Sequence, residues 1–288
     1  MAWNRDAVLT LLKEAAAGGA VEVHFKVPGR PMLRSPQGTL LPANAPPLSA
    51  VDATSVAVSL GQLAGTEFTS ATVTDLEFGF GVAGVGRFRA SIYRQRGTLS
   101  AVVRCLRSNP PSFADLGVPD SVDRLVGRAG LLIVCGTRHR ELLAACIHAF
   151  NARERGHAVV IESAITTLHR DAMATVAQRE VGVDVGSHAA GVRAAINAGA
   201  DLIAVDQIPD AATTDAVLCA AERGISVVAA VAATEPKDAA WFLTRTLTGE
   251  FRLDAELRIH RTLRAVISVP RDGKAVVTLP DTALELPA

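Results

Sequence analysis

The sequence predicts an α/β protein with two domains, and three observations support this class. Short apolar strands alternate with helical stretches in the C-terminal half, a rhythm typical of a parallel sheet with helices on both faces. The N-terminal half alternates strands with turns and predicts a smaller α+β domain. A stretch with consecutive prolines, Ser108 to Pro119, separates the halves, because proline interrupts helices and strands alike.

The expected boundaries follow from these changes in pattern. Residues 1–107 form the N-terminal domain, 108–120 the linker and 121–288 the C-terminal domain. The N-terminal domain opens on an amphipathic helix and continues as hairpins with turns at Ala83-Gly84 and Arg96-Gly97. The expected strands of the C-terminal domain are Leu131 to Val134, Ala158 to Ile161, Asp201 to Val205 and Ile225 to Val231.

Composition excludes several classes of function. The formal net charge is zero with a pI near 7.1, which argues against nucleic-acid binding by the chain as a whole. The most apolar runs are far shorter than the roughly 20 residues that cross a bilayer, so no membrane insertion is expected. The four cysteines are scattered without metal-ligand spacing, which favours a reducing cytoplasm and no zinc.

One stretch has the outline of a nucleotide-binding loop. In "GLLIVCGTRHRELLAACIHAFN", Gly130 to Asn151, an apolar strand runs into Gly136, a polar turn and an apolar helix. An ATPase of the P-loop type holds its phosphates at such a place. Here no glycine-rich loop follows, and the Lys-Ser or Lys-Thr pair of that motif is missing.

Several segments in order resemble the PilT family of type IV pilus retraction ATPases, relatives of the GspE secretion ATPases. The segments are "AVEVHF", "GRPMLRSPQGTL", "DLEFGF", "GRFRASIYRQRGTLSAVVR", "FADLGVP", "GLLIVCG", "QREVGVD", "GVRAAINAGADLIAVDQIPD", "LCAAERGISVV" and "LRAVIS". The resemblance implies a PAS-like N-terminal domain, a RecA-like ATPase domain and a habit of hexamer formation. It also implies that the usual C-terminal helices are missing here, because only about twenty residues follow "LRAVIS".

The phosphate loop of the family has the form GxxxxGK[ST], and two alignments are open for it here. Without gaps, Glu141, Leu142 and Leu143 replace the second glycine, the lysine and the hydroxyl. With a deletion, the loop itself is missing. In the ungapped alignment the Glu141 carboxylate would repel a phosphate charge about 5 Å away, and this repulsion would cost about 3 kcal/mol. The degenerate loop comprises Gly136, Thr137, Arg138, His139, Arg140, Glu141, Leu142 and Leu143.

The other family motifs are altered as well. Gln207 occupies the position of the catalytic glutamate, and a glutamine cannot take up a proton at neutral pH. The preceding Asp206, where the family has glycine, is the candidate ligand for Mg²⁺. The acidic box keeps Glu162 but has Ser163 in place of an aspartate, and the sensing histidine falls at Ala232.

Family members also use arginines to reach nucleotide across a domain or subunit contact. Arg193 matches a family arginine in the C-terminal domain, whereas Asn197 replaces another. The alternative role for the N-terminal arginines is a solvated basic strand face. The candidates for phosphate or subunit contacts in that domain are Arg87, Arg89, Arg94, Arg96 and Arg104.

Three functions remain open at this point. The first is a pseudo-ATPase without cofactor, which acts as adaptor, regulator or ring subunit beside an active PilT-like motor or the inner-membrane platform of a pilus. It would be cytoplasmic, held at the membrane through partners, and a homo- or hetero-oligomer. The second is a weak, divergent ATPase that binds Mg-ATP through Arg138 or Arg140 and Asp206. The third is a module that binds another ligand, such as a cyclic dinucleotide.

Overall fold

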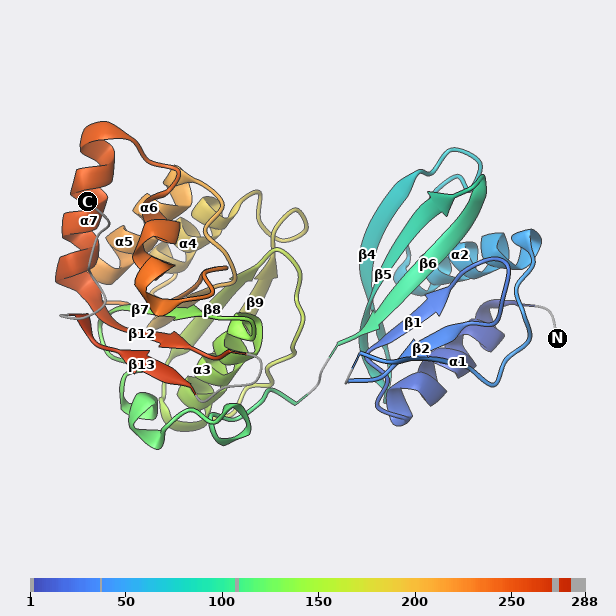
Figure 1. Ribbon diagram of the computed structural model, residues 1–288, viewed down its shortest axis with the longest axis horizontal. Coiled ribbons are helices and arrows are strands. Elements are labelled where there is room, and N and C mark those ends of the chain that lie inside the picture. The colour runs from blue at the N-terminus through green and yellow to red at the C-terminus, as the bar shows by residue number, and fades with distance from the viewer. Residues whose placement is uncertain (1–2, 37, 107–108, 271–274, 281–288) are drawn as a thin grey trace. The chain divides into compact units, whose positions relative to one another are not determined.

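The computed structural model describes residues 3–36, 38–106, 109–270 and 275–280. The chain divides into two compact units, Met1–Ser108 and Asn109–Ala288 (Figure 1). No helix within the described residues is long and apolar enough to cross a membrane.

The first unit is a six-stranded antiparallel sheet with two helices, in the strand order β3-β2-β1-β6-β5-β4. Alternate strand residues such as Val23 and Phe25 are buried, so one face of the sheet carries the core with both helices. The Ser49 hydroxyl and the Asp52 carboxylate form a capping box that starts the second helix. The elements are α1 (Arg5–Ala17), β1 (Glu22–Phe25), β2 (Met32–Arg34), β3 (Leu40–Pro42), α2 (Ala50–Ala64), β4 (Asp75–Val82), β5 (Gly86–Gln95) and β6 (Thr98–Cys105).

The second unit is a seven-stranded sheet in the order β13-β12-β7-β11-β10-β8-β9, and all neighbours are parallel except β12 and β13. Its strands are β7 (Gly130–Cys135), β8 (His157–Glu162), β9 (Thr175–Glu180), β10 (Leu202–Val205), β11 (Ser226–Ala230), β12 (Leu263–Ser268) and β13 (Val276–Thr278). Its helices are η1 (Ala114–Leu116), η2 (Asp120–Arg124), α3 (His139–Arg153), α4 (His188–Asn197), α5 (Ala211–Glu222), η3 (Pro236–Asp238), α6 (Ala239–Thr244) and α7 (Gly249–Thr262).

Helices cover both faces of this sheet, which explains why its central strands are apolar throughout (Figure 1). Neighbouring residues of β7 point to opposite faces: Leu131 and Ile133 belong to a core shared with α4, α5 and α7. Leu132 and Val134 belong to a second core, shared with α3 and the segment from Phe113. The α/β class predicted from the sequence is confirmed.

Strands β9 and β12 are not among the strands expected from the sequence. β9 carries Gln178, Arg179 and Glu180 and lies at the edge, where polar residues are tolerated, so no apolar run marks it. The likeness of the first unit to PAS domains and the boundaries at 1–107, 108–120 and 121–288 stay predictions, and residues 107 and 108 lie outside the described part of the chain.

Candidate functional site

The connection between β7 and α3 is only three residues long, from Gly136 to Arg138. Gly136 has a φ of 89°, and a Cβ there would lie 2.6 Å from the carbonyl oxygen of Val269, so the position requires glycine. The Gly136 N–H donates to the Ala233 carbonyl at 2.8 Å, and the Arg138 N–H donates to the Val269 carbonyl at 3.2 Å. Two amides of this turn are thus bound to carbonyls of the protein itself.

The side chains after this turn do not face a common site. Arg138 Nε donates to Glu141 Oε2 at 2.6 Å, so the arginine is paired within the first turn of α3. Leu142 and Leu143, which the ungapped alignment puts at the lysine and hydroxyl positions, are buried in the core beneath α3. Arg140 is exposed at the edge of a small cavity.

The carboxyl ends of β8 and β10 bring together the acidic-box and glutamate positions. The strands are adjacent and parallel, with Ile161 opposite Val205, so the residues that follow them meet. The Ser163 N–H donates to Asp206 Oδ2 at 3.0 Å, and Gln207 Nε2 donates to Ser163 Oγ at 2.6 Å. The altered residues of two motifs therefore contact each other directly.

A buried histidine completes this network. His188, at the start of α4, has its Nε2 at 2.9 Å from Asp206 Oδ1 and at 3.3 Å from Ser163 Oγ. Serine, histidine and aspartate suggest a hydrolase triad, but a triad needs the aspartate and the serine on opposite ring nitrogens. Here Ser163 and Asp206 both contact Nε2 of His188. These contacts connect α4 with the ends of β8 and β10, and they do not activate the serine as a nucleophile.

Glu162 lies beside this network in an apolar setting and is 7% exposed. Burial raises the pKa of its carboxyl to about 8, and the nearby Asp206 and Glu180 carboxylates add to the rise. Hydrogen bonds from Gln178 Nε2, at 3.1 Å, and from the Thr166 backbone oppose it. The raised pKa favours the neutral carboxyl, which makes Glu162 a weak candidate for binding a cation.

The space at this edge of the sheet is small. Arg140, Leu143, Glu162, His169 and Asp206 border a cavity of about 10 Å³, which has room for about one water molecule. His169 Nδ1 is buried and has no hydrogen-bond partner among the described residues, and burial lowers the pKa of this ring to about 4. No cluster of three or more histidine, cysteine or carboxylate side chains suited to a metal occurs in the part of the chain that the structure describes.

The N-terminal arginines divide into two groups. Arg94 donates to the carbonyl oxygens of Val73, Ser70, Ala71 and Gly97 and so has a structural role. Arg89 pairs with Glu77, and Arg104 pairs with Glu22. Arg87 and Arg96 form no hydrogen bond or ion pair through their side chains with any other described residue, so they stay available for a partner.

The remaining predicted residues lie apart from this cluster. Arg193 is exposed on α4, and Ala232 follows β11. Sequence reasoning missed His188, Gln178 and His169 as neighbours of Asp206 and Glu162. The only signal for His188 was its place after Ser187, a residue type that commonly caps the N-terminus of a helix. The spatial contact itself has no signature in a single sequence.

The chain is similar in sequence to several known proteins. No family model matches the chain. The type IV pilus ATPase PilU of Pseudomonas aeruginosa is 27% identical over 221 residues, 74% of this chain and 58% of PilU. The retraction ATPase PilT of the same organism is 27% identical over 267 residues, 91% of this chain and 76% of PilT. The uncharacterised protein YggR of Escherichia coli is 28% identical over 197 residues, 67% of this chain and 60% of YggR.

Two solved structures of ATPases are similar to this chain over most of its length. A crystal structure of the pilus retraction motor PilT with bound ADP superposes with a TM-score of 0.79 at 28% identity, and it covers 93% of this chain and 80% of that one. The ATPase DotB of Legionella pneumophila gives a TM-score of 0.78 at 23% identity over 96% of this chain and 80% of DotB, which supports the fold. The chain spans less than two thirds of the length of PilU and of YggR.

Proposed function

Because the chain belongs to the PilT/GspE superfamily of pilus and secretion ATPases, we propose that it is a member without ATP hydrolysis that acts through protein contacts. In this proposal it is an adaptor, regulator or ring subunit beside an active motor of a type IV pilus or a related secretion system. It would be held at the cytoplasmic side of the membrane by such partners.

The connection between β7 and α3 is the observation that carries the proposal. A phosphate loop needs free backbone amides, a lysine and a hydroxyl that all point at one ligand. In this turn two amides are bound to the Ala233 and Val269 carbonyls, and Leu142 and Leu143 are buried in a core. These residues fit Mg-ATP poorly, because Leu142 and Leu143 supply neither the lysine nor the hydroxyl of the motif and two amides of the turn already have acceptors.

The ends of β8 and β10 support the same proposal. Gln207 donates its amide to Ser163 and cannot act as a general base. Asp206 already accepts from His188 and from the Ser163 backbone, so its carboxylate would have to leave two partners to bind Mg²⁺. A divergent ATPase would retain only the N-terminal turn of α3 and Arg140 for its phosphates.

Calorimetry with the purified protein tests the proposal directly. ATP, ADP and a cyclic dinucleotide are titrated with Mg²⁺, and no heat of binding is expected for any of them up to millimolar concentration. Turnover of ATP is measured in parallel and is expected to equal the buffer background. Tight binding of Mg-ATP would overturn the proposal, and binding of the cyclic dinucleotide alone would favour a ligand-binding module.

The adaptor role needs a separate measurement. The protein is mixed with an active PilT-type ATPase, and the mass of the mixture is determined by light scattering with and without ATP. A complex of fixed stoichiometry is expected. Arg87 is exposed on β5, so the Arg87→Ala variant tests whether this side chain contacts the partner, and weaker complex formation is expected. Two proteins that stay separate under all conditions would contradict the adaptor role.

A further inference from the structure

The sheet of the first unit has β3 at one edge and β4 at the other (Figure 1). β3 is three residues long and ends at Pro42, and short strands and prolines protect an edge against pairing with a further strand. β4 is eight residues long and contains neither proline nor lysine. An edge of this kind is a template on which another strand can form.

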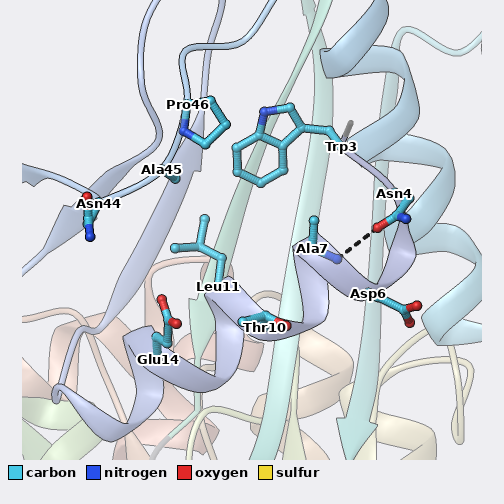
Figure 2. Close-up of a pocket in the computed structure, with 10 residues that line it drawn as sticks. All are labelled: Trp3, Asn4, Asp6, Ala7, Thr10, Leu11, Glu14, Asn44, Ala45 and Pro46. Atoms are coloured by element: carbon cyan, nitrogen blue, oxygen red, sulfur yellow. Dashed lines mark hydrogen bonds between the residues drawn. The ribbon is translucent and has the colours of Figure 1, made fainter. Parts of the chain in front are cut away.

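The apolar face of the same sheet is covered by helices, but the cover is incomplete at β4. Figure 2 shows Trp3 and Leu11 between α1 and Pro46, and both side chains are buried in the core of the unit. At the β4 edge, Leu76 and Phe78 pack against this core and are only partly buried. A further strand beside β4 would cover both of these side chains.

The backbone of β4 presents every second residue to the free edge. The Arg94 N–H donates to the Thr74 carbonyl at 3.0 Å, so the even-numbered residues of β4 are those that bond to β5. The N–H and C=O groups of the odd-numbered residues point away from β5 and have no backbone partner in the part of the chain that the structure describes. These exposed residues are Asp75, Glu77, Gly79 and Gly81.

The outer face of the β4–β5 hairpin carries unpaired charges of both signs. The exposed Arg87 side chain crosses two glycines: its Cγ lies 3.9 Å from the place of a Cβ on Gly81, and its Nη2 lies 3.9 Å from that on Gly79. The Asp75 carboxylate has no ion-pair partner among the described residues. Asp75 is opposite Tyr93, six residues from Arg87 along β5 or about 20 Å, so the two charges do not pair within one chain.

We infer that β4 pairs with β4 of a second copy of this chain, antiparallel and about a two-fold axis at Phe78. The outward N–H and C=O groups of the two strands then bond to each other. Each Asp75 lies opposite Gly81 of the second copy, where the missing side chain leaves room for Arg87 of that copy to reach the carboxylate. A two-fold axis one residue further along would place Asp75 opposite Ala83, in the turn after β4.

The packing on the apolar face agrees with this arrangement. Phe78 meets Phe78 of the second copy in a pair without hydrogen bonds, the kind in which side chains approach most closely, and aromatic pairs at such positions stabilise a sheet. Leu76 lies opposite Phe80 of the second copy. The inference goes beyond the proposed function and does not depend on nucleotide, since all its residues lie in the unit Met1–Ser108.

Sedimentation equilibrium and amide hydrogen exchange on the full chain without nucleotide test this inference. The mass is expected to rise from 30.1 kDa toward twice that value as the protein concentration increases to millimolar. Over the same range the N–H groups of Glu77 and Gly79 should become protected from exchange. Those of Phe78 and Phe80, which bond to β5, should be protected at every concentration.

Two substitutions at Gly79 form a matched pair. Gly79→Pro removes an outward N–H and none of the hydrogen bonds to β5, so it should abolish the dimer and leave the circular dichroism unchanged. Gly79→Ala keeps the N–H, and its Cβ would make ordinary contacts at 3.8 and 3.9 Å, so this variant should dimerise like the parent.

A charge exchange tests the register without a change in the backbone. Asp75→Arg and Arg87→Asp should each weaken the dimer about tenfold, and the double variant should restore it, because opposite charges then meet again between the two copies. A monomer at millimolar concentration, equal dimerisation of the Gly79→Pro and Gly79→Ala variants, or a double variant weaker than both single ones would overturn the inference.

Discussion

His188 Nε2 lies 2.9 Å from Asp206 Oδ1, and the two side chains are only 5% and 6% exposed. Asp206 also accepts the backbone N–H of Ser163 at 3.0 Å. The carboxylate thus connects the ends of β8 and β10 with the first residue of α4. The residue that the sequence offers as a candidate ligand for Mg²⁺ has a structural role in this geometry.

Asp206→Ala is expected to lower the free energy of unfolding by on the order of 3 kcal/mol, because a buried histidine and a buried amide lose their acceptor. Chemical denaturation followed by circular dichroism measures the change. Gln207→Ala is the matched control at the next position: its side chain is exposed and makes one hydrogen bond, so less than about 1 kcal/mol is expected. Equal stabilities of the two variants would contradict the structural role of Asp206.

Glu162 makes stability depend on pH. Its pKa is 4.5 when exposed and about 8 when buried in the fold, so the folded state retains a proton that the unfolded state releases. Its contribution is most favourable below pH 4.5 and is lost as the pH rises through 8. Glu162→Gln removes this loss, and the slope of stability against pH between about 5 and 8 should become less negative by up to about 1.4 kcal/mol per pH unit.

The control for this measurement is Glu77→Gln. Hydrogen bonds from Arg89 and Ser91 lower the pKa of the Glu77 carboxyl, so its contribution is lost only as the pH falls into the acidic range. The slope between pH 5 and 8 should therefore match that of the parent protein. If Glu162→Gln also matches the parent, the Glu162 carboxyl is ionised at neutral pH.

The α/β class of the second unit could be predicted because its central strands are apolar on both faces, as Leu131 to Val134 illustrate. β9 could not, since an edge strand needs no apolar run. At the candidate site, the sequence predicted that Asp206 and Gln207 follow one strand and Ser163 another. It could not predict that His188 would take the Asp206 carboxylate, because that contact depends on how α4 packs against the sheet.

Arg94 should be the structural residue among the candidate N-terminal arginines. Its guanidinium donates to four backbone carbonyls, including Val73 at 2.8 Å, and fixes the loop before β4. Arg94→Ala is expected to destabilise the first unit by about 2 kcal/mol in calorimetric unfolding. Arg87→Ala should change it by less than about 0.5 kcal/mol. A reversed order would mean that Arg94 is available for a partner and Arg87 is not.

Restoring a lysine at Leu142 tests whether the ungapped alignment describes the loop. Leu142 is fully buried beneath α3, so Leu142→Lys puts an ammonium group in an apolar core and should destabilise the protein by at least about 3 kcal/mol. Leu142→Met is the matched control and should cost less than about 1.5 kcal/mol. Calorimetry with Mg-ATP should detect no binding by either variant. A stable Leu142→Lys variant that binds Mg-ATP would show that the turn at Gly136 can open into a phosphate loop, because the lysine would then have left the core for the ligand.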